Sequence, residues 1–344
     1  MTYLQETPGK DHARPICKFK DTNSRPESIM MSNSKRISAI EDLQSSDGRL
    51  VYALGGVDLH MRLKKAPLSD ALIIGFHGNV DRENRAVPAF ISDIPEVHQH
   101  AHQLQLADPS LRLSETLTMS WYAGDHLFDA QRLIAEFCKA AAKALGASKV
   151  IYFGTSGGGF AALYYSSQHP DSLALVGNPQ TDIRKYYQRR VNTYLETCWP
   201  DLASIEDLKG QIATNVCDLY AQSISNSVIY LQNSTDAFHL FGHMAPFLSG
   251  ITRGDLQKRV AVECVFSGRI GHNPVWSVFS PWVRAAIAAP SWSAQDLTET
   301  KFKLVASSPA AAPKSGQPSS RFSAADLAMA ELLQDHQSRA REKV

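Results

Sequence analysis

The sequence predicts an α/β protein with a doubly wound, mostly parallel sheet. Short apolar runs that are typical of buried strands alternate along the chain with longer amphipathic helical patterns. This alternation indicates parallel strands joined by crossover helices. One strand, at 150–153, also turns abruptly into a helix through a glycine-rich stretch. We therefore expect one large domain over residues 37–290.

The composition excludes some classes of function. The 344 residues carry a formal net charge of +1, so bulk charge indicates neither nucleic acid nor a membrane surface as partner. The first residues contain no apolar leader, and no apolar run approaches the ~18 residues of a membrane span. Five scattered cysteines without a C-x-x-C pair are typical of reduced thiols. We expect a cytoplasmic protein that acts on a small-molecule or glycan substrate.

Both ends of the chain are expected to lie outside this domain. Residues 1–36 are polar and contain prolines, which favours a disordered tail. Residues 291–322 include a Ser/Ala/Pro-rich stretch and are predicted to be a linker. Residues 323–344 then have a helical pattern, and this C-terminal helix either docks on the core or binds a protein partner.

The expected strands follow one another in a regular order. Gly55-Gly56 splits the first apolar stretch into two hairpin strands, the second of which alternates apolar and polar residues. The later runs are short, apolar and bounded by turn residues, as expected of buried strands. A helix at 126–145, stopped by Gly146, precedes the glycine-rich turn. The expected strands lie at 50–63 (two strands), 71–76, 101–107, 150–153, 172–177, 227–232 and 259–266.

Three histidines form the pattern H-x-H-x-H at His98, His100 and His102. On one strand this spacing would place three imidazoles on the same face, as in a metal site. The pattern of Leu104 and Leu106 that follows indicates the start of another strand, so we interpret them as edge or loop histidines. We expect neither a metal ion nor an organic cofactor.

The strand at 150–153 leads into the motif G-x-S-x-G, formed by Gly154, Ser156 and Gly158. A serine between a strand and a helix sits at a strained turn, and the flanking glycines let backbone pass where a Cβ would clash. Its hydroxyl then stands beside the first N–H groups of the helix. We identify Ser156 as the candidate nucleophile. The plain alternative is a glycine-rich turn without chemistry.

A serine that attacks a carbonyl needs hydrogen-bond donors for the oxyanion that forms. The N–H of Gly157 is one candidate donor. The turn His77-Gly78-Asn79 follows the strand at 71–76 directly and can present a second N–H group, from Gly78 or Asn79. The alternative is an ordinary turn between a strand and a loop.

The serine also needs a histidine as its base and a carboxylate that orients this histidine. Asp236 directly follows the strand at 227–232, and His272 follows the last strand. Three candidates that each follow a strand, in the order Ser, Asp, His, are more specific than any single motif. Asp182, after the strand at 172–177, stays open as a second candidate acid.

Two further histidines lie close to Asp236 in the sequence. His239 and His243 fall in the stretch AFHLFGHM, which has a helical pattern. We interpret them as residues that line the site or pack beside it, and not as the base.

These motifs resemble those of the α/β-hydrolase superfamily. The resemblance covers about residues 50–290 and rests on HGN, GTSGGG, NSTD and GHNP in their order along the chain. It implies the α/β-hydrolase fold, with a nucleophile elbow at Ser156. The three consecutive glycines after Ser156 depart from many relatives, which carry a side chain there. The segments NPQTDI and YLQNSTDAFH are similar to a bacterial subgroup associated with surface-glycan synthesis.

The stretch 181–226 is helical in pattern and rich in aromatic residues and arginine. An insertion here would lie over the carboxyl ends of the strands, where ligands bind in open α/β sheets, so we expect a helical lid. Aromatic faces stack on sugar rings, and arginines bind phosphate or carboxylate groups. Alternatively, the aromatic residues pack the helices onto the sheet and the arginines face water. The candidate substrate-binding residues are Arg184, Tyr187, Arg189 and Arg190, with Tyr186, Tyr194 and Trp199 as further aromatic faces.

These expectations lead to a serine hydrolase that cleaves an ester or amide through an acyl-enzyme, with an acylated glycan as candidate substrate. Two alternatives stay open. An acyltransferase would use the same triad to acylate a sugar hydroxyl, and a non-catalytic interaction protein would have kept only the fold. The superfamily includes all of these classes, so the fold alone does not decide between them.

Overall fold

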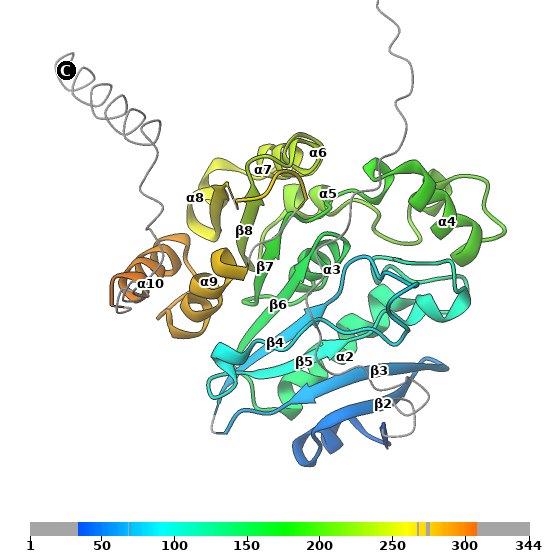
Figure 1. The fold of residues 1–344 in the computed structure, drawn as a ribbon, viewed down its shortest axis with the longest axis horizontal. Coiled ribbons are helices and arrows are strands. Elements are labelled where there is room, and N and C mark those ends of the chain that lie inside the picture. Colours follow the sequence, from blue (N-terminus) through cyan, green and yellow to red (C-terminus); the bar gives the residue numbers. More distant parts are fainter. Residues whose placement is uncertain (1–33, 68, 267, 273–275, 308–344) are drawn as a thin grey trace, which may run out of the picture. The chain divides into compact units, whose positions relative to one another are not determined.

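The computed structural model describes residues 34–307, apart from 68, 267 and 273–275 (Figure 1). The tail expected before residue 34 and the helix expected at 323–344 therefore lie outside the described residues. By its contacts the chain divides into two units, residues 1–301 and 302–344, and the candidate site lies within the first.

Within the described residues the strands form one mixed, nine-stranded sheet in the order β1-β2-β3-β5-β4-β6-β7-β8-β9. All neighbours from β5 to β9 run parallel, whereas β3 pairs antiparallel with β2 and β5. Each strand expected from the sequence is present. The strands are β1 (Lys35–Ile37), β2 (Gly48–Leu54), β3 (Val57–Lys64), β4 (Ala71–Phe76), β5 (His102–Leu106), β6 (Lys149–Thr155), β7 (Leu173–Gly177), β8 (Ser227–Asn233) and β9 (Val260–Val265).

Helices connect the parallel strands and lie on both faces of the sheet (Figure 1). The α-helices are α2 (Ala130–Ala144), α3 (Gly157–Ser167), α4 (Gln188–Cys198), α5 (Val216–Gln222), α6 (Ala237–His239), α7 (Ala245–Gly250), α8 (Arg253–Arg259), α9 (Trp276–Ala288) and α10 (Ala294–Ser307). Shorter helical turns are η1 (Ile40–Ser45), η2 (Pro95–Val97), η3 (Pro109–Leu113), η4 (Ile183–Lys185), η5 (Ile205–Leu208) and the π-helical η6 (Leu240–Met244).

The central strands are buried on both faces, because successive side chains alternate between two separate cores. Tyr152 stacks on Phe76, with ring centroids 6.3 Å apart, in the core that includes α3. Its neighbour Phe153 meets Phe279 of α9 in the other core, at 5.7 Å. Parallel strands that are covered on both faces keep their carboxyl ends free to carry functional loops.

The helix expected at 126–145 begins later than predicted. Its first residue is Ala130, and the Asp129 side chain accepts a hydrogen bond from the Arg132 N–H at 3.3 Å. The preceding residues form a tight turn, closed by the Phe128 N–H on the Asp125 carbonyl. Leu127, which lies in this turn and not in the helix, is 63% exposed.

The boundaries of the flanking segments also differ from the prediction. The linker expected at 291–322 is wrong for its first half, because α10 begins at Ala294. The Ser293 hydroxyl caps this helix, and Leu297 is buried against the core. At the other end, β1 pairs with β2 from Lys35 onward, inside the range expected to be a tail.

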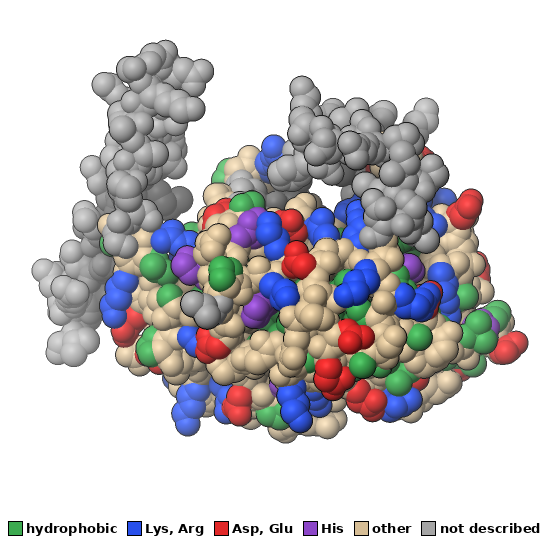
Figure 2. Space-filling model, turned by 90° about the horizontal axis from the view of Figure 1, so that it is seen from below, with side chains coloured by type: hydrophobic (Ala, Val, Ile, Leu, Met, Phe, Trp, Pro, Cys, Tyr) green, Lys and Arg blue, Asp and Glu red, His purple; other side chains and the backbone are tan. Residues whose placement is uncertain are grey.

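The surface agrees with the balanced composition. On the face drawn in Figure 2, lysine and arginine side chains are interspersed with aspartate and glutamate. Within the described residues, no helix is long and apolar enough to cross a membrane.

Candidate active site

Ser156 lies in the turn between β6 and α3, with φ 56° and ψ −124°. This left-handed conformation is strained for a residue with a Cβ, and strain of this kind collects at functional turns. The neighbouring glycines make the turn sterically possible. A Cβ on Gly154 would lie 2.1 Å from the Gly158 carbonyl oxygen, and a Cβ on Gly158 would lie 2.3 Å from the Phe76 carbonyl oxygen.

The other two glycines of the triple also face neighbouring segments. A Cβ on Gly157 would lie 2.1 Å from Met119 Sδ, and one on Gly159 would lie 2.6 Å from Pro179 Cβ. The contacts of Gly158 and Gly159 are with backbone and a proline ring, which cannot move aside, whereas the contact of Gly157 is with the far end of the flexible Met119 side chain.

The turn after β4 lies directly against the serine. The Cβ position of Gly78 is 3.4 Å from Ser156 Cβ and 3.8 Å from the Gly157 nitrogen. No described residue accepts a hydrogen bond from the Gly157 or the Asn79 N–H. These groups therefore remain open as donors to an oxyanion beside Ser156.

His77 orients this turn. Its Nε2 accepts a hydrogen bond from the Asp108 N–H at 3.2 Å, so Nδ1 carries the hydrogen and donates to the Gly78 carbonyl at 2.7 Å. Because a trans peptide points its carbonyl and its N–H in opposite directions, the Asn79 N–H is directed away from His77. Burial lowers the pKa of His77 to about 4, which keeps the imidazole neutral.

The candidate acid and base meet at the ends of β8 and β9. His272 Nδ1 donates to Asp236 Oδ2 at 2.8 Å, and the Asp236 side chain is 5% exposed. Burial on its own would raise the pKa of the Asp236 carboxyl. Hydrogen bonds from His239 and His272 outweigh this effect and hold the pKa well below its usual value.

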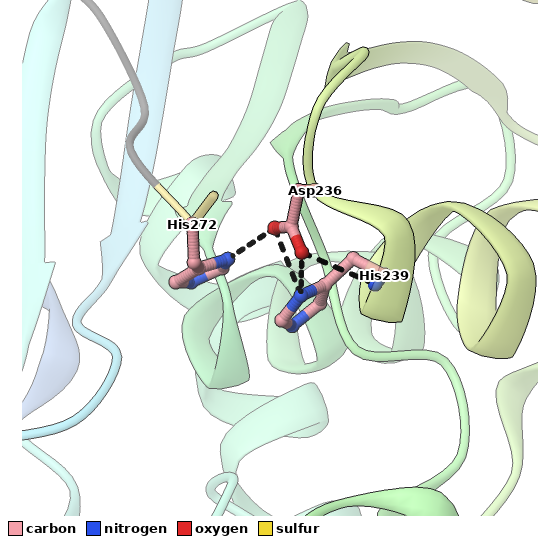
Figure 3. Close-up of side chains that lie close together, drawn as sticks. All are labelled: Asp236, His239 and His272. Carbon is pink, nitrogen blue, oxygen red and sulfur yellow. Dashed lines mark hydrogen bonds and ion pairs between the residues drawn. The ribbon is translucent and has the colours of Figure 1, made fainter. Parts of the chain in front are cut away.

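A second imidazole lies on the same carboxylate (Figure 3). His239 Nδ1 is 2.9 Å from Asp236 Oδ2, and its ring stacks on that of His272, with centroids 4.1 Å apart and an angle of 20° between the planes. Its Nε2 is buried and has no hydrogen-bond partner among the described residues. Burial lowers the pKa of His239, and the hydrogen bond to Asp236 opposes this. His239 was expected only to line the site or pack beside it, and the spacing D-x-x-H was the signal for a closer role.

Neither imidazole is hydrogen-bonded to the serine. Among the described residues, the only side-chain partner of Ser156 Oγ is Gln180 Nε2, at 3.1 Å. Contacts between nucleophile and base are often loose without substrate and tighten in the complex. Sequence reasoning missed Gln180, although the residue directly follows β7 in the same way that Asp236 follows β8.

Asp182, the second candidate acid, has another partner. Its carboxylate binds the Arg184 guanidinium through two hydrogen bonds of 2.8 Å, and no described histidine is bonded to it. Arg184 also pairs with Glu206 at 3.2 Å. Arg184, a candidate substrate-binding residue, is therefore held by two carboxylates of the chain itself.

The other candidate binding residues differ in exposure. Tyr187 is 56% exposed and stacks on Phe238, with centroids 4.7 Å apart. Arg189 is exposed, and the exposed Arg190 donates to the Thr118 hydroxyl at 2.9 Å. Tyr194 is fully buried, as the packing alternative predicted for this aromatic residue.

The H-x-H-x-H histidines do not share one strand face. Only His102 lies in β5, where its Nδ1 accepts from the Ala66 N–H, whereas His98 follows η2. The described group with donor atoms close enough for a metal ion is instead Asp236, His239 and His272, within 4.8 Å of one another. In this arrangement both Nδ1 atoms face the carboxylate as N–H donors, and a metal ion would have to displace both hydrogens.

No protein-family model and no curated protein matches this chain. Among solved structures, the chain is similar to the capsule O-acetyltransferase of Neisseria meningitidis serogroup A, at 14% identity and a TM-score of 0.50, over 67% of this chain and 94% of that one. It is also similar to the acylaminoacyl peptidase of Pyrococcus horikoshii, at 12% identity and a TM-score of 0.47, over 73% of this chain and 40% of that one. A third similar structure is dipeptidyl peptidase 4 of Porphyromonas gingivalis, at 9% identity and a TM-score of 0.47, over 69% of this chain and 34% of that one. At these identities the likeness concerns the fold alone, and the described residues have an α/β fold similar to that of the capsule O-acetyltransferase.

Proposed function

We propose that this protein is a serine hydrolase with an α/β-hydrolase fold, which cleaves an ester through an acyl-enzyme. Ser156 is the nucleophile, His272 the base, and Asp236 the carboxylate that orients the imidazole. The N–H groups of Gly157 and of Gly78 or Asn79 bind the oxyanion. The observation that carries this proposal is the strained Ser156 turn, with the Gly78 turn packed directly against it.

The reaction follows from these groups. His272 Nε2 takes the Ser156 hydroxyl proton while the oxygen attacks the acyl carbon, and the carbonyl oxygen becomes the oxyanion. Collapse of this intermediate breaks the bond to the leaving group, which receives the proton from His272. Water then enters and gives a proton to the same imidazole while its oxygen attacks the acyl carbon. The bond from the acyl carbon to Ser156 Oγ breaks, Oγ takes the proton back from His272, and the acid is released. Asp236 stays ionised throughout, because two imidazoles hydrogen-bond to it.

For the substrate we propose an acylated glycan, bound beneath residues 181–226 acting as a lid. Tyr187 offers an exposed aromatic face, and Arg189 and Arg190 are exposed cationic groups on the same helical segment. Arg184 is not part of this binding surface, because Asp182 and Glu206 hold its guanidinium. We also propose a cytoplasmic location.

Acyl transfer to a sugar hydroxyl is the second candidate. The fold likeness to a capsule O-acetyltransferase favours it, and it needs the same groups up to the acyl-enzyme. The two reactions part only at the second step, where either water or a sugar hydroxyl attacks. p-Nitrophenyl acetate with and without a methyl glycoside separates them: an acetylated glycoside identifies a transferase, and acetate alone identifies a hydrolase.

A fluorophosphonate probe tests the nucleophile. We expect one adduct, mapped to Ser156 by peptide mass spectrometry, and none in Ser156→Ala. Ser167→Ala, at the other end of α3, should label like the wild type. An adduct that persists in Ser156→Ala would contradict the assignment of the nucleophile. A wild-type protein without adduct would contradict the proposal and favour a non-catalytic interaction protein.

A further inference from the structure

We propose that Gln180 is a further catalytic residue, whose side-chain amide donates a hydrogen bond to the nucleophile oxygen. Gln180 Nε2 lies 3.1 Å from Ser156 Oγ, and its main-chain N–H donates to the Ser156 carbonyl at the same distance. The inference rests on the proposed function, because it assigns a role in the attack by Ser156.

Trp121 decides which end of the amide faces the serine. An indole N–H can only donate a hydrogen bond, and Trp121 Nε1 is hydrogen-bonded to Gln180 Oε1. A flipped amide would place its NH₂ group against this indole N–H, donor against donor. The NH₂ group of Gln180 therefore faces Ser156, and the serine oxygen accepts.

The Gln180 amide is buried, and both of its polar atoms are hydrogen-bonded. Its Oε1 accepts from Trp121 Nε1, and its Nε2 donates to Ser156 Oγ. A buried amide is stable only where its polar atoms have partners. These partners leave the amide one orientation, with its donor on the nucleophile.

Both chain segments that deliver this arrangement are conformationally strained. Trp121 and Tyr122 have φ values of 54° each, and Asn178, two residues before the glutamine, has φ 41°. Buried polar contacts hold both segments. The Tyr122 N–H donates to Asp108 Oδ2 at 3.0 Å, and Asn178 Oδ1 accepts from the Asn233 N–H at 2.7 Å. Strain on both sides of one hydrogen-bonded pair indicates that the pair has a function beyond packing.

This hydrogen bond has two consequences for the attack. Because Ser156 Oγ accepts from Gln180, its own hydrogen is left to donate to an imidazole. As the proton moves to His272 Nε2, negative charge develops on Oγ, and the amide donor stabilises this charge in a water-poor site. No additional proton or electron is needed, because the amide stays intact.

The test measures the second-order rate constant of Ser156 labelling by the fluorophosphonate probe. Gln180→Ala removes the donor and should slow labelling by about tenfold or more. Gln103→Ala is the matched control, because Gln103 is also buried but bonds to Ile94. We expect its labelling rate to stay within about twofold of the wild type.

Gln180→Glu provides a readout that packing alone would not move. At neutral pH its carboxylate can only accept, so labelling should be slow. As the pH falls, the protonated carboxyl regains a donor, and the ratio of the variant rate to the wild-type rate should rise. If the ratio of the Gln180→Glu rate to the wild-type rate does not change with pH, the inference is overturned. This test holds even if Gln180→Ala does not fold.

Trp121→Phe tests Trp121 as a positioning residue. It keeps an aromatic ring but lacks the indole N–H, so it should slow labelling in the wild-type background and have no further effect in Gln180→Ala. If Trp121→Phe slows labelling equally in the wild type and in Gln180→Ala, Trp121 does not act through Gln180.

If Gln180→Ala labels at the wild-type rate, the inference is overturned and the proposed function stands. If the wild type itself is not labelled at Ser156, both are overturned.

Discussion

The imidazoles of His239 and His272 stack 4.1 Å apart on a single carboxylate, that of Asp236. Two Nδ1–H donors on one buried acid fix both tautomers, so that both Nε2 atoms carry lone pairs. The side chains differ in exposure, at 3% for His239 and 35% for His272. The more exposed ring, that of His272, is accessible to a bound substrate, and the buried His239 ring stacks against its face.

Asp236→Asn should therefore lower turnover by roughly 10⁴-fold, because an amide that donates toward Nδ1 favours the wrong tautomer of the base. The measurement is steady-state hydrolysis of p-nitrophenyl acetate, with circular dichroism to confirm folding. Asp182→Asn is the control. It should lower the melting temperature through the loss of the Arg184 pair and leave kcat within about threefold. A large loss of kcat in Asp182→Asn alone would make Asp182 the acid.

Single alanine variants separate the two histidines. His272→Ala should abolish labelling of Ser156, whereas His239→Ala should retain labelling at a reduced rate, because Asp236 then holds one imidazole only. Labelling that survives in His272→Ala but not in His239→Ala would assign the base to His239.

The buried His77 predicts how stability depends on pH. Its pKa is about 4 in the folded protein and 6.5 in the unfolded chain, so the unfolded state binds the proton more readily. The contribution of His77 is complete above pH 6.5 and is lost as the pH falls toward 4, by up to about 3 kcal/mol. Urea unfolding from pH 7 to pH 4 measures this loss. His77→Gln should be less stable at pH 7, and its free energy of unfolding should fall less steeply toward pH 4. A pH dependence equal to that of the wild type would show that His77 does not cause the loss.

Alanine at two of the turn glycines should disrupt the nucleophile turn. Gly158→Ala would place a Cβ 2.3 Å from a backbone oxygen, and Gly159→Ala would place one 2.6 Å from Pro179. We expect each to cost several kcal/mol of folding stability or to abolish labelling of Ser156. Gly254→Ala in α8 is the control, since nothing lies within 4 Å of its Cβ position. Alanine there should stabilise the helix by about 0.5–1 kcal/mol, as measured by thermal melting.

Arginine substitutions test the proposed substrate contacts. Replacing Arg189 and Arg190 together by alanine should raise KM for anionic acylated sugars more than for neutral ones, because both guanidinium groups are exposed. Arg184→Ala should instead lower the melting temperature and leave this preference unchanged, because Arg184 binds Asp182. Equal effects of the double variant on both substrate types would remove the arginines from the binding surface.

The sequence by itself determined the α/β class, the strands β2 to β9 and the turns that follow them. These features are local: apolar runs of strand length, glycines at a strand-to-helix turn, and polar residues directly after strands. Parallel strands place their carboxyl ends at one edge, so Asp236 and His272 could be paired across 36 residues without coordinates. The start of α2 and the presence of α10 were mispredicted, because tight turns and side-chain caps near their first residues leave weak patterns.

Tertiary structure alone decided the further contacts between polar side chains at the site. Gln180 turns its amide NH₂ group toward Ser156 because Trp121, 59 residues earlier in the chain, donates to the amide oxygen. His239 shares Asp236 with His272 because α6 begins at this acid and directs the ring across it. Arg184 matches a binding residue by type, yet Asp182 and Glu206 hold it. Such partnerships depend on rotamers and on contacts between distant segments, and these have no periodic signature in a sequence.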